Sequence, residues 1–160
     1  MTANISDKGT VAIGCDHAGY FVKVRLKTAL ALMGAYNIRD FGTESEESAD
    51  YPDYARLVVE AILGGEAAWG ILSCGTGLGM SYAANRYSGI RAAVCWSAEV
   101  ARLARDHNDA NILIVPGRAA TLDPPEEILA AWLEVNFSGE TRHLRRIRKL
   151  DEEATRGKEG

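Results

Sequence analysis

Short apolar segments alternate with helical patterns along most of the chain. Residues 10–15 form an apolar run without helical periodicity, whereas apolar residues in 18–33 recur two to four positions apart, as on one face of a helix. The same alternation predicts further strands at 36–41, 69–74, 90–96 and 112–115. It predicts further helices at 52–63, 80–85, 97–108, 126–137 and 141–154. Apolar strands that alternate with helices are typical of an α/β fold, so we expect a doubly wound, Rossmann-like three-layer sandwich with a five-stranded parallel sheet and a basic C-terminal helix.

The length of 160 residues fits one domain spanning 1–160. Hydrophobic residues make up 47% and charged residues 25%, which excludes a disordered chain and a coiled coil. The tails at 1–8 and 155–160 lack an apolar pattern, and we expect them to be flexible.

Charge and hydropathy narrow the choice of partners. With 18 basic and 22 acidic residues the net charge is −4, which argues against nucleic acid as a partner. No apolar stretch approaches the roughly 18–20 residues that cross a bilayer, and the N-terminus lacks the apolar core of a signal peptide. An odd cysteine count of 3 favours free thiols. We therefore expect a cytoplasmic protein that does not contact a membrane.

In a parallel α/β sheet, ligands bind beyond the carboxyl ends of the strands. Three segments are assigned to this edge on sequence order: Asp16-His17, the loop 74–79 with sequence CGTGLG, and 105–108 at the end of the fourth helix. Cys74 precedes three alternating glycines and the next helix, where free N–H groups and the helix dipole favour a thiolate. The alternative is a small core residue, the interpretation we prefer for Cys15 and Cys95 because neither precedes a glycine loop.

The glycine loop fits none of three familiar motifs. A dinucleotide fingerprint starting at Gly75 requires a glycine where Met80 stands, and a P-loop requires a lysine that this loop lacks. A cysteine phosphatase loop requires an arginine at the same position as Met80. What remains is a cluster of backbone N–H groups, next to a thiol, that could hold a small anion or an oxyanion.

Two other pairs of polar residues carry candidate chemistry. Asp16 and His17 offer a hydrogen-bond acceptor and a phosphate donor, although an aspartate after a strand is also a common helix N-cap. His107 and Asn108 end a predicted helix, where a histidine also complements the helix dipole. The scattered histidines show no metal-ligand spacing, so we expect no metal.

The predicted last helix concentrates positive charge. Five basic residues and no acidic ones lie within 141–150, which leaves 13 basic against 22 acidic residues in the rest of the chain. Arg142 and Arg146 share a helix face and could together clamp one phosphate. The alternative is an ordinary solvated, charged face.

Five segments taken together resemble the ribose-5-phosphate isomerase type B family, which includes galactose-6-phosphate isomerase subunits. The resemblance spans about residues 10–150 in order. It rests on these segments: IGCDHAG from 13, DYPD from 50, GILSCGTGLGMS from 70 with AAN from 83, GIRAA from 89, and HNDAN from 107.

The resemblance implies an aldose–ketose isomerase that interconverts ribose 5-phosphate and ribulose 5-phosphate through a cis-enediol, without metal or organic cofactor. It makes Cys74 the base, with His107 and Asp16 in ring opening and Thr76 in proton movement on oxygen. It implies further substrate contacts at these positions: His17, Tyr51, Gly75, Gly77, Gly79, Ser81, Asn108, Arg118, Arg142 and Arg146. It also implies a homodimer or tetramer in which His107, Asn108 and Arg118 reach a neighbour's site.

Departures from the family pattern are few. Cys15 stands where a smaller residue is usual, and Tyr82 replaces a smaller apolar residue. Two alternatives stay open: isomerisation of another phosphosugar, with four or six carbons, and a non-catalytic domain that binds a phosphosugar or nucleotide.

Overall fold

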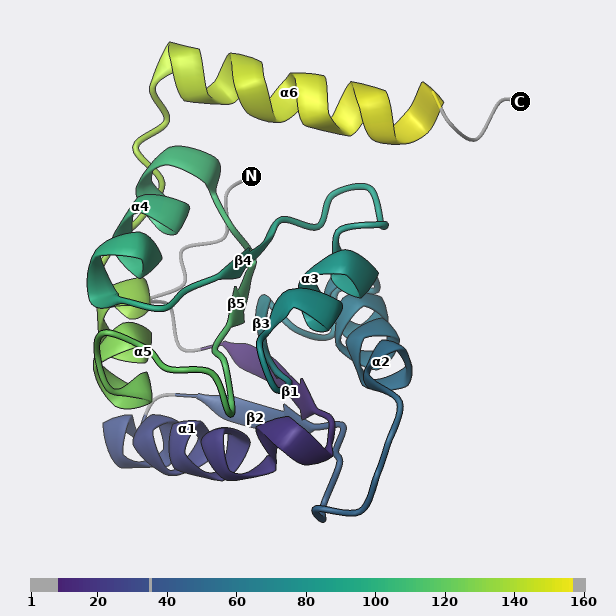
Figure 1. Cartoon of the computed structure of the whole chain (residues 1–160). Helices are drawn as coiled ribbons and strands as arrows, with labels where there is room; N and C mark the ends of the chain where they lie inside the picture. The colour runs from purple at the N-terminus through teal and green to yellow at the C-terminus, as the bar shows by residue number, and fades with distance from the viewer. Residues whose placement is uncertain (1–8, 35, 157–160) are drawn as a thin grey trace.

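A computed structural model describes residues 9–34 and 36–156 of the chain (Figure 1). The strands are β1 (Thr10–Cys15), β2 (Asn37–Asp40), β3 (Trp69–Ser73), β4 (Ala92–Val94) and β5 (Ile112–Ile114). The helices are α1 (Tyr20–Met33), α2 (Tyr51–Leu63), α3 (Leu78–Ala84), α4 (Ala98–Asn108), α5 (Pro125–Leu133) and α6 (Thr141–Arg156), with a 3-10 turn η1 (His17–Gly19) before α1. Each predicted strand and helix is present.

The strands form one parallel sheet in the order β2-β1-β3-β5-β4. From β1 the described chain first adds β2 at one edge, and it then crosses back to add β3, β4 and β5 on the other side of β1. This arrangement confirms the predicted doubly wound α/β fold, in which polar groups at the carboxyl ends of the strands gather along one edge.

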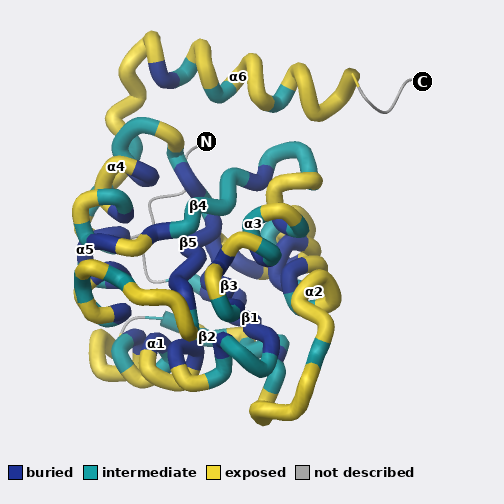
Figure 2. Tube along the Cα trace, in the orientation of Figure 1, coloured by how far each residue is buried: buried dark blue, intermediate teal, exposed yellow. Residues whose placement is uncertain are grey.

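Alternate residues of the strands enter two separate cores, one on each face of the sheet. Val11 and Ile13 pack with α1, α4 and α5, whereas Ala12 between them packs with α2 and α3. β3 shows the same division, since Ile71 joins the first core and Leu72 the second. The result is the expected three-layer sandwich, and Figure 2 shows the buried strands between more exposed helices.

The boundaries of β4, α5 and α6 differ from the prediction. α5 ends at Leu133, four residues before the predicted end. β4 is three residues long because the N–H of Arg91 donates to the Asn111 side chain at 2.8 Å instead of joining the sheet. α6 continues to Arg156, two residues beyond the predicted end. Residues 1–8 and 157–160, which belong to the predicted flexible tails, lie outside the described part of the chain.

α6 is the most exposed helix of the described chain. It runs along the top of the molecule in Figure 1, next to the end of α4, and His143 is its one buried residue. Within the described ranges, no helix combines the length and apolar character needed to cross a bilayer.

Candidate active site

The loops that follow β1 and β3 are joined at the carboxyl edge of the sheet. The N–H of Asp16 donates to the carbonyl of Ser73 over 3.2 Å. A side chain at Gly19 would lie 2.3 Å from the same Ser73 carbonyl oxygen, so only glycine fits there. The DHAG segment therefore keeps its glycine because η1 packs directly on the end of β3.

The loop after β5 closes on the same two segments. The N–H of Gly117 donates to the carbonyl of Cys74 at 2.8 Å, and that of Arg118 donates to the carbonyl of Gly75 at 2.9 Å. A side chain at Gly117 would meet the Ala18 carbonyl oxygen at 2.3 Å. Three loops from distant parts of the sequence thus form one frame held by backbone hydrogen bonds.

Asp16 combines the two roles that its sequence position left open. Its Oδ1 accepts the N–H groups of Ala18 at 2.9 Å and Gly19 at 3.1 Å, which is the N-cap of η1. Both bonds go to Oδ1, so in the described structure Oδ2 remains an available acceptor at this edge. The cap orients the carboxylate, and its second oxygen can then serve a ligand.

His17 is held by a backbone donor. The N–H of Ala49, in the loop before α2, donates to Nδ1 of His17 at 3.1 Å. Because an amide N–H can only donate, Nδ1 is the unprotonated nitrogen and the neutral ring carries its hydrogen on Nε2. His17 therefore offers Nε2–H as a hydrogen-bond donor, as a phosphate ligand requires.

The glycine loop has free donors beside the thiol. Gly77 has a φ of 83°, in the left-handed region that favours glycine, and α3 begins at the next residue. The side chain of Thr76 accepts the N–H of Leu78 at 3.2 Å. The N–H groups of Gly75, Thr76 and Gly77 have no acceptor among the described residues, so they are free to bind an oxyanion.

The three cysteines lie in different surroundings. Cys15 and Cys95 are fully buried, and burial raises the pKa of the Cys15 thiol to about 11 and that of Cys95 to about 12. Both are core residues, as predicted, and both stay protonated at neutral pH. Cys74 directly follows β3, next to the free N–H groups, and is 4% exposed. It is the one cysteine placed where a thiol can meet a ligand.

Tyr51 lies against the far side of the glycine loop. A side chain at Gly79 would come within 2.8 Å of the Tyr51 ring. The Oγ of Ser81 accepts the side-chain amide of Asn85 at 3.2 Å. A surface cavity of about 420 Å³ opens between Tyr51 and Tyr82 on α3, but neither Cys74 nor His107 lines it.

His107 and Asn108 lie at the opposite edge of the sheet, which corrects the placement made on sequence order. α4 starts after the carboxyl end of β4 and runs back, so its last residues immediately precede β5. Ile112 pairs with Gly70, and the level of Cys74 lies four residues further along. At about 3.3 Å per residue this separates the two groups by at least roughly 13 Å along the strands. His107 and Cys74 of one chain therefore do not form one site.

The imidazole of His107 is packed between α4 and α6. Its ring stacks on that of His143, with centroids 4.5 Å apart and planes 16° from parallel. Its Nε2 lies 3.3 Å from a carboxylate oxygen of Asp106. Burial lowers the pKa of His143, and the neighbouring His107, Arg142 and Arg146 lower it further. The stack thus joins the start of α6 to the end of α4.

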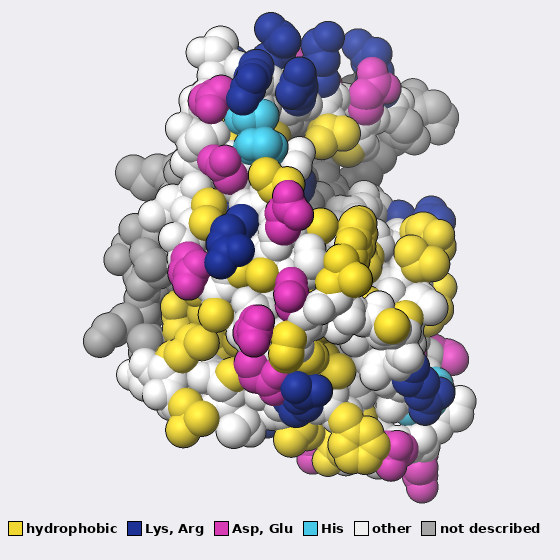
Figure 3. All heavy atoms as spheres, turned by 60° about the vertical axis from the view of Figure 1, so that its left-hand side comes forward, with side chains coloured by type: hydrophobic (Ala, Val, Ile, Leu, Met, Phe, Trp, Pro, Cys, Tyr) yellow, Lys and Arg dark blue, Asp and Glu magenta, His cyan; other side chains and the backbone are white. Residues whose placement is uncertain are grey.

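Arg142 and Arg146 lie on α6, at the same edge as His107 and far from the glycine loop. Arg142 forms an exposed ion pair with Glu140 at 3.0 Å. Figure 3 shows the basic side chains gathered over α6, with the two histidines directly beneath them. The backbone of Arg118 lies at the carboxyl edge, where its N–H donates to the Gly75 carbonyl.

The sequence did not reveal which residues hold the turn between α4 and β5. The side chain of Asn111 accepts from Arg91 N–H and donates to the Gly89 carbonyl, both at 2.8 Å. Asp109 has a φ of 45° and binds the buried guanidinium of Arg105 at 3.0 Å. The HNDAN segment of the sequence could have pointed to these residues, because Asp109 and Asn111 hold the turn that directly follows His107 and Asn108.

The chain is similar in sequence and in fold to the proteins of one family. The family model for ribose/galactose isomerase matches residues 11–150. Ribose-5-phosphate isomerase B of Escherichia coli is 43% identical over 88% of this chain and 93% of its own.

Two solved structures of ribose-5-phosphate isomerase B are also similar to this chain. That of Thermotoga maritima is 54% identical, with a TM-score of 0.83 over 89% of this chain and 97% of the other. That of Clostridium thermocellum is 46% identical, with a TM-score of 0.87 over 92% and 98%. The chain therefore belongs to the ribose/galactose isomerase family and is an aldose–ketose isomerase.

Proposed function

We propose that the protein interconverts ribose 5-phosphate and ribulose 5-phosphate, with Cys74 as the base. The observation that carries this proposal is the position of the Cys74 thiol beside the free N–H groups of residues 75–77. Two similar proteins that carry the name ribose-5-phosphate isomerase B support the choice of substrate.

The proposed reaction moves one proton between neighbouring carbons. The Cys74 thiolate removes the C2 proton of the open-chain aldose, and negative charge develops on the carbonyl oxygen at C1. The free N–H groups stabilise this charge in the cis-enediolate more than they stabilise the neutral sugar. Cys74 then returns the proton to C1, while Thr76 assists transfer between the two oxygens. A base of this kind contributes typically about 10²–10⁴-fold.

The proposed site is complete only between two chains. His107 and Asn108 lie too far from Cys74 to serve it within one chain, and Arg142 and Arg146 lie with them. We propose a homodimer in which the opposite edge of the neighbour brings His107 to open the sugar ring and the two arginines to the phosphate. Asp16 and His17 contribute from the same chain as Cys74.

The remaining parts of the proposal concern cofactor and location. The chemistry above uses neither metal nor organic cofactor, so a chelator should leave turnover unchanged. Three free cysteines support a reducing, cytoplasmic location.

Replacement of Cys74 tests the mechanism. Cys74→Ala should lower kcat for ribose 5-phosphate by about 10³-fold or more with the fold intact, because the base is removed. Cys95→Ala, which truncates a fully buried cysteine directly after β4, is the matched control. Conversion is followed by the absorbance of the ketose product. Near-normal turnover by Cys74→Ala would exclude Cys74 as the base.

A second substrate class is favoured by the family itself, whose name includes galactose. Comparison of kcat/KM for phosphosugars of four, five and six carbons separates these candidates, because each wrong length misplaces the phosphate relative to Cys74. A protein that binds ribose 5-phosphate in calorimetry without converting any of them would instead be a binding domain.

A further inference from the structure

Lys23 is a buried cation next to the carboxyl edge that the proposed mechanism does not use. It lies on the inner face of α1 and is 2% exposed. Its Nζ lies 2.9 and 3.0 Å from the two carboxylate oxygens of Asp40, and it donates to the carbonyl of Thr43 at 2.6 Å. A buried ammonium is costly unless its hydrogens find acceptors, and here all three acceptor atoms belong to the end of β2 and the turn after it.

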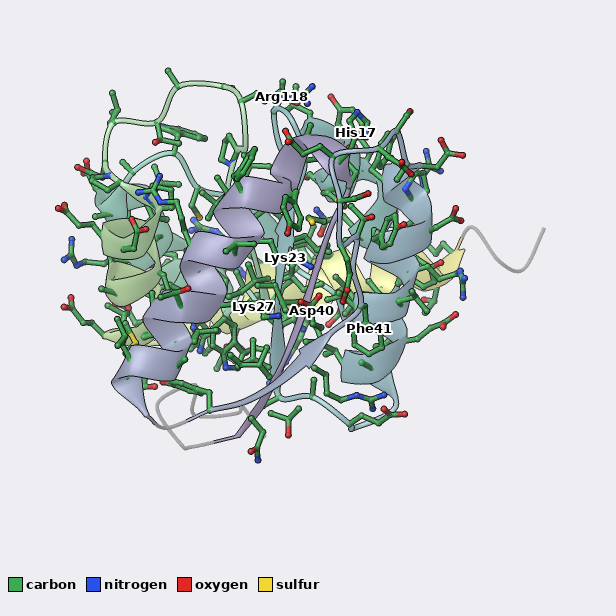
Figure 4. All side chains as sticks on the ribbon, turned by 90° about the horizontal axis from the view of Figure 1, so that it is seen from below. His17, Lys23, Lys27, Asp40, Phe41 and Arg118 are labelled. Atoms are coloured by element: carbon green, nitrogen blue, oxygen red, sulfur yellow. The ribbon has the colours of Figure 1, made fainter. Side chains whose placement is uncertain are left out.

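Asp40 is the centre of this cluster. Burial by itself would raise the pKa of its carboxyl, but hydrogen bonds from Lys27, the Gly42 N–H and Lys23 outweigh burial and lower it. Lys27 binds the carboxylate at 2.6 Å from a more exposed position. Figure 4 shows Lys23 and Lys27 of α1 converging on Asp40. Only Lys23 also reaches the backbone beyond β2.

The turn that Lys23 binds is hydrogen-bonded to Cys15, the last residue of β1. The N–H of Cys15 donates to the Gly42 carbonyl at 2.6 Å, and the N–H of Thr43 donates to the Cys15 carbonyl at 2.7 Å. Asp16 and His17 follow Cys15 directly. A shift of the turn would therefore move the backbone from which the Asp16 and His17 side chains extend.

The same segment returns to His17 from its other end. After Thr43 the chain passes through exposed residues 44–48, and the N–H of Ala49 then donates to Nδ1 of His17. Of the residues described, Ala49 is the donor that fixes which ring nitrogen carries the hydrogen. The segment anchored by Lys23 thus binds the backbone of Cys15, two residues before His17, at one end and the His17 imidazole at the other.

We propose that Lys23 is a positioning residue for His17, because it anchors the 40–49 segment that orients the imidazole and keeps its hydrogen on Nε2. Lys23 itself is too buried to touch a sugar phosphate. The role of His17 as the phosphate donor rests on the proposed function, whereas the effect of Lys23 on the His17 ring does not.

The experiment compares Lys23→Met with Lys27→Met in the full-length protein. Both remove one ammonium from the same carboxylate, but only the first releases the Thr43 carbonyl. Nitrogen chemical shifts of His17 report which ring nitrogen is protonated, independently of activity. We expect wild type and Lys27→Met to show unprotonated Nδ1, and Lys23→Met to show a mixture with protonated Nδ1. Ala49→Pro removes the N–H donor and should give the same mixture.

Kinetics supply a second readout that a purely structural role would not produce. Lys23→Met should raise KM for ribose 5-phosphate about tenfold and change kcat less than about threefold, because the phosphate donor is misplaced while Cys74 is untouched. Should Lys23→Met fail to fold, Lys23→Gln keeps one donor without the charge and should show the same changes in smaller degree.

An unchanged His17 spectrum in folded Lys23→Met or Lys23→Gln overturns the proposal. So does an equal change in Lys27→Met, which would show that charge on Asp40 is all that matters. If the spectrum changes but wild-type protein isomerises no phosphosugar, the positioning role stands and the proposed function fails.

Discussion

The two edges of the sheet are built in different ways. At the carboxyl edge, backbone hydrogen bonds join three loops. Glycines at 19 and 117 let the backbones of these loops approach each other closely. At the opposite edge, side chains hold the turn before β5, and α6 carries its arginines on an exposed helix. The first edge positions groups within one chain. The second presents its arginines on the exposed surface of the molecule.

The largest expected effect on turnover comes from replacing one residue at each edge, Cys74 in one chain and His107 in the other. Cys74→Ala and His107→Asn homodimers should each retain less than about 1% of wild-type kcat. Heterodimers of the two, purified with different tags, should recover about half, because one of their two sites has both residues intact. Turnover of the mixed species is the measurement.

A mixture of two differently tagged Cys74→Ala chains is the control and should recover nothing. Absence of recovery in the true heterodimer would show that the proposed site is not shared between subunits.

A smaller effect, on KM, should distinguish the two arginines of the proposed phosphate clamp from the other arginines of α6. Arg142→Ala and Arg146→Ala should each raise KM for ribose 5-phosphate about 10–100-fold, because each removes a charge-assisted hydrogen bond worth about 1.5–3 kcal/mol. Arg145→Ala and Arg148→Ala are matched controls on the same helix and should stay within about twofold. Equal losses in all four variants would indicate a general charge effect instead of a phosphate clamp.

The smallest effect concerns stability at the edge held by side chains. Asn111→Ala should lower the free energy of unfolding by about 1–3 kcal/mol, because it leaves the Arg91 N–H and the Gly89 carbonyl without partners. Asn85→Ala removes a similar pair of bonds, to both backbone groups of Ala92, at an exposed position where water can replace them. Urea unfolding should show a smaller loss for Asn85→Ala, and the reverse order would contradict this account.

Much of the fold was predictable because its determinants are local. Apolar runs bounded by glycine, proline and capping residues mark strands and helices, and Ser97 caps α4 as its position suggests. The same holds for half of the site, since Cys74, the glycine loop, Asp16 and His17 all directly follow strands.

The other half of the proposed site was assigned to the wrong edge of the sheet, because the order of elements along the sequence does not by itself say toward which edge a helix runs. His107 lies in the last turn of a helix, and a helix that returns across a parallel sheet ends at the opposite edge. The partnership of Lys23 with Asp40 was also missed, because each residue alone resembles an ordinary surface charge and they are 17 positions apart.

The sequence was enough to predict the alternation of strands and helices, the thiol beside a glycine loop, and the basic last helix, because each depends on neighbours a few residues away. The three-dimensional fold was needed to show which of these groups share an edge, that Lys23 is buried against the turn after β2, and that His107 and Cys74 lie at opposite ends of the sheet. These properties depend on the direction of each crossover and on contacts between distant segments, which exist only once the sheet has formed.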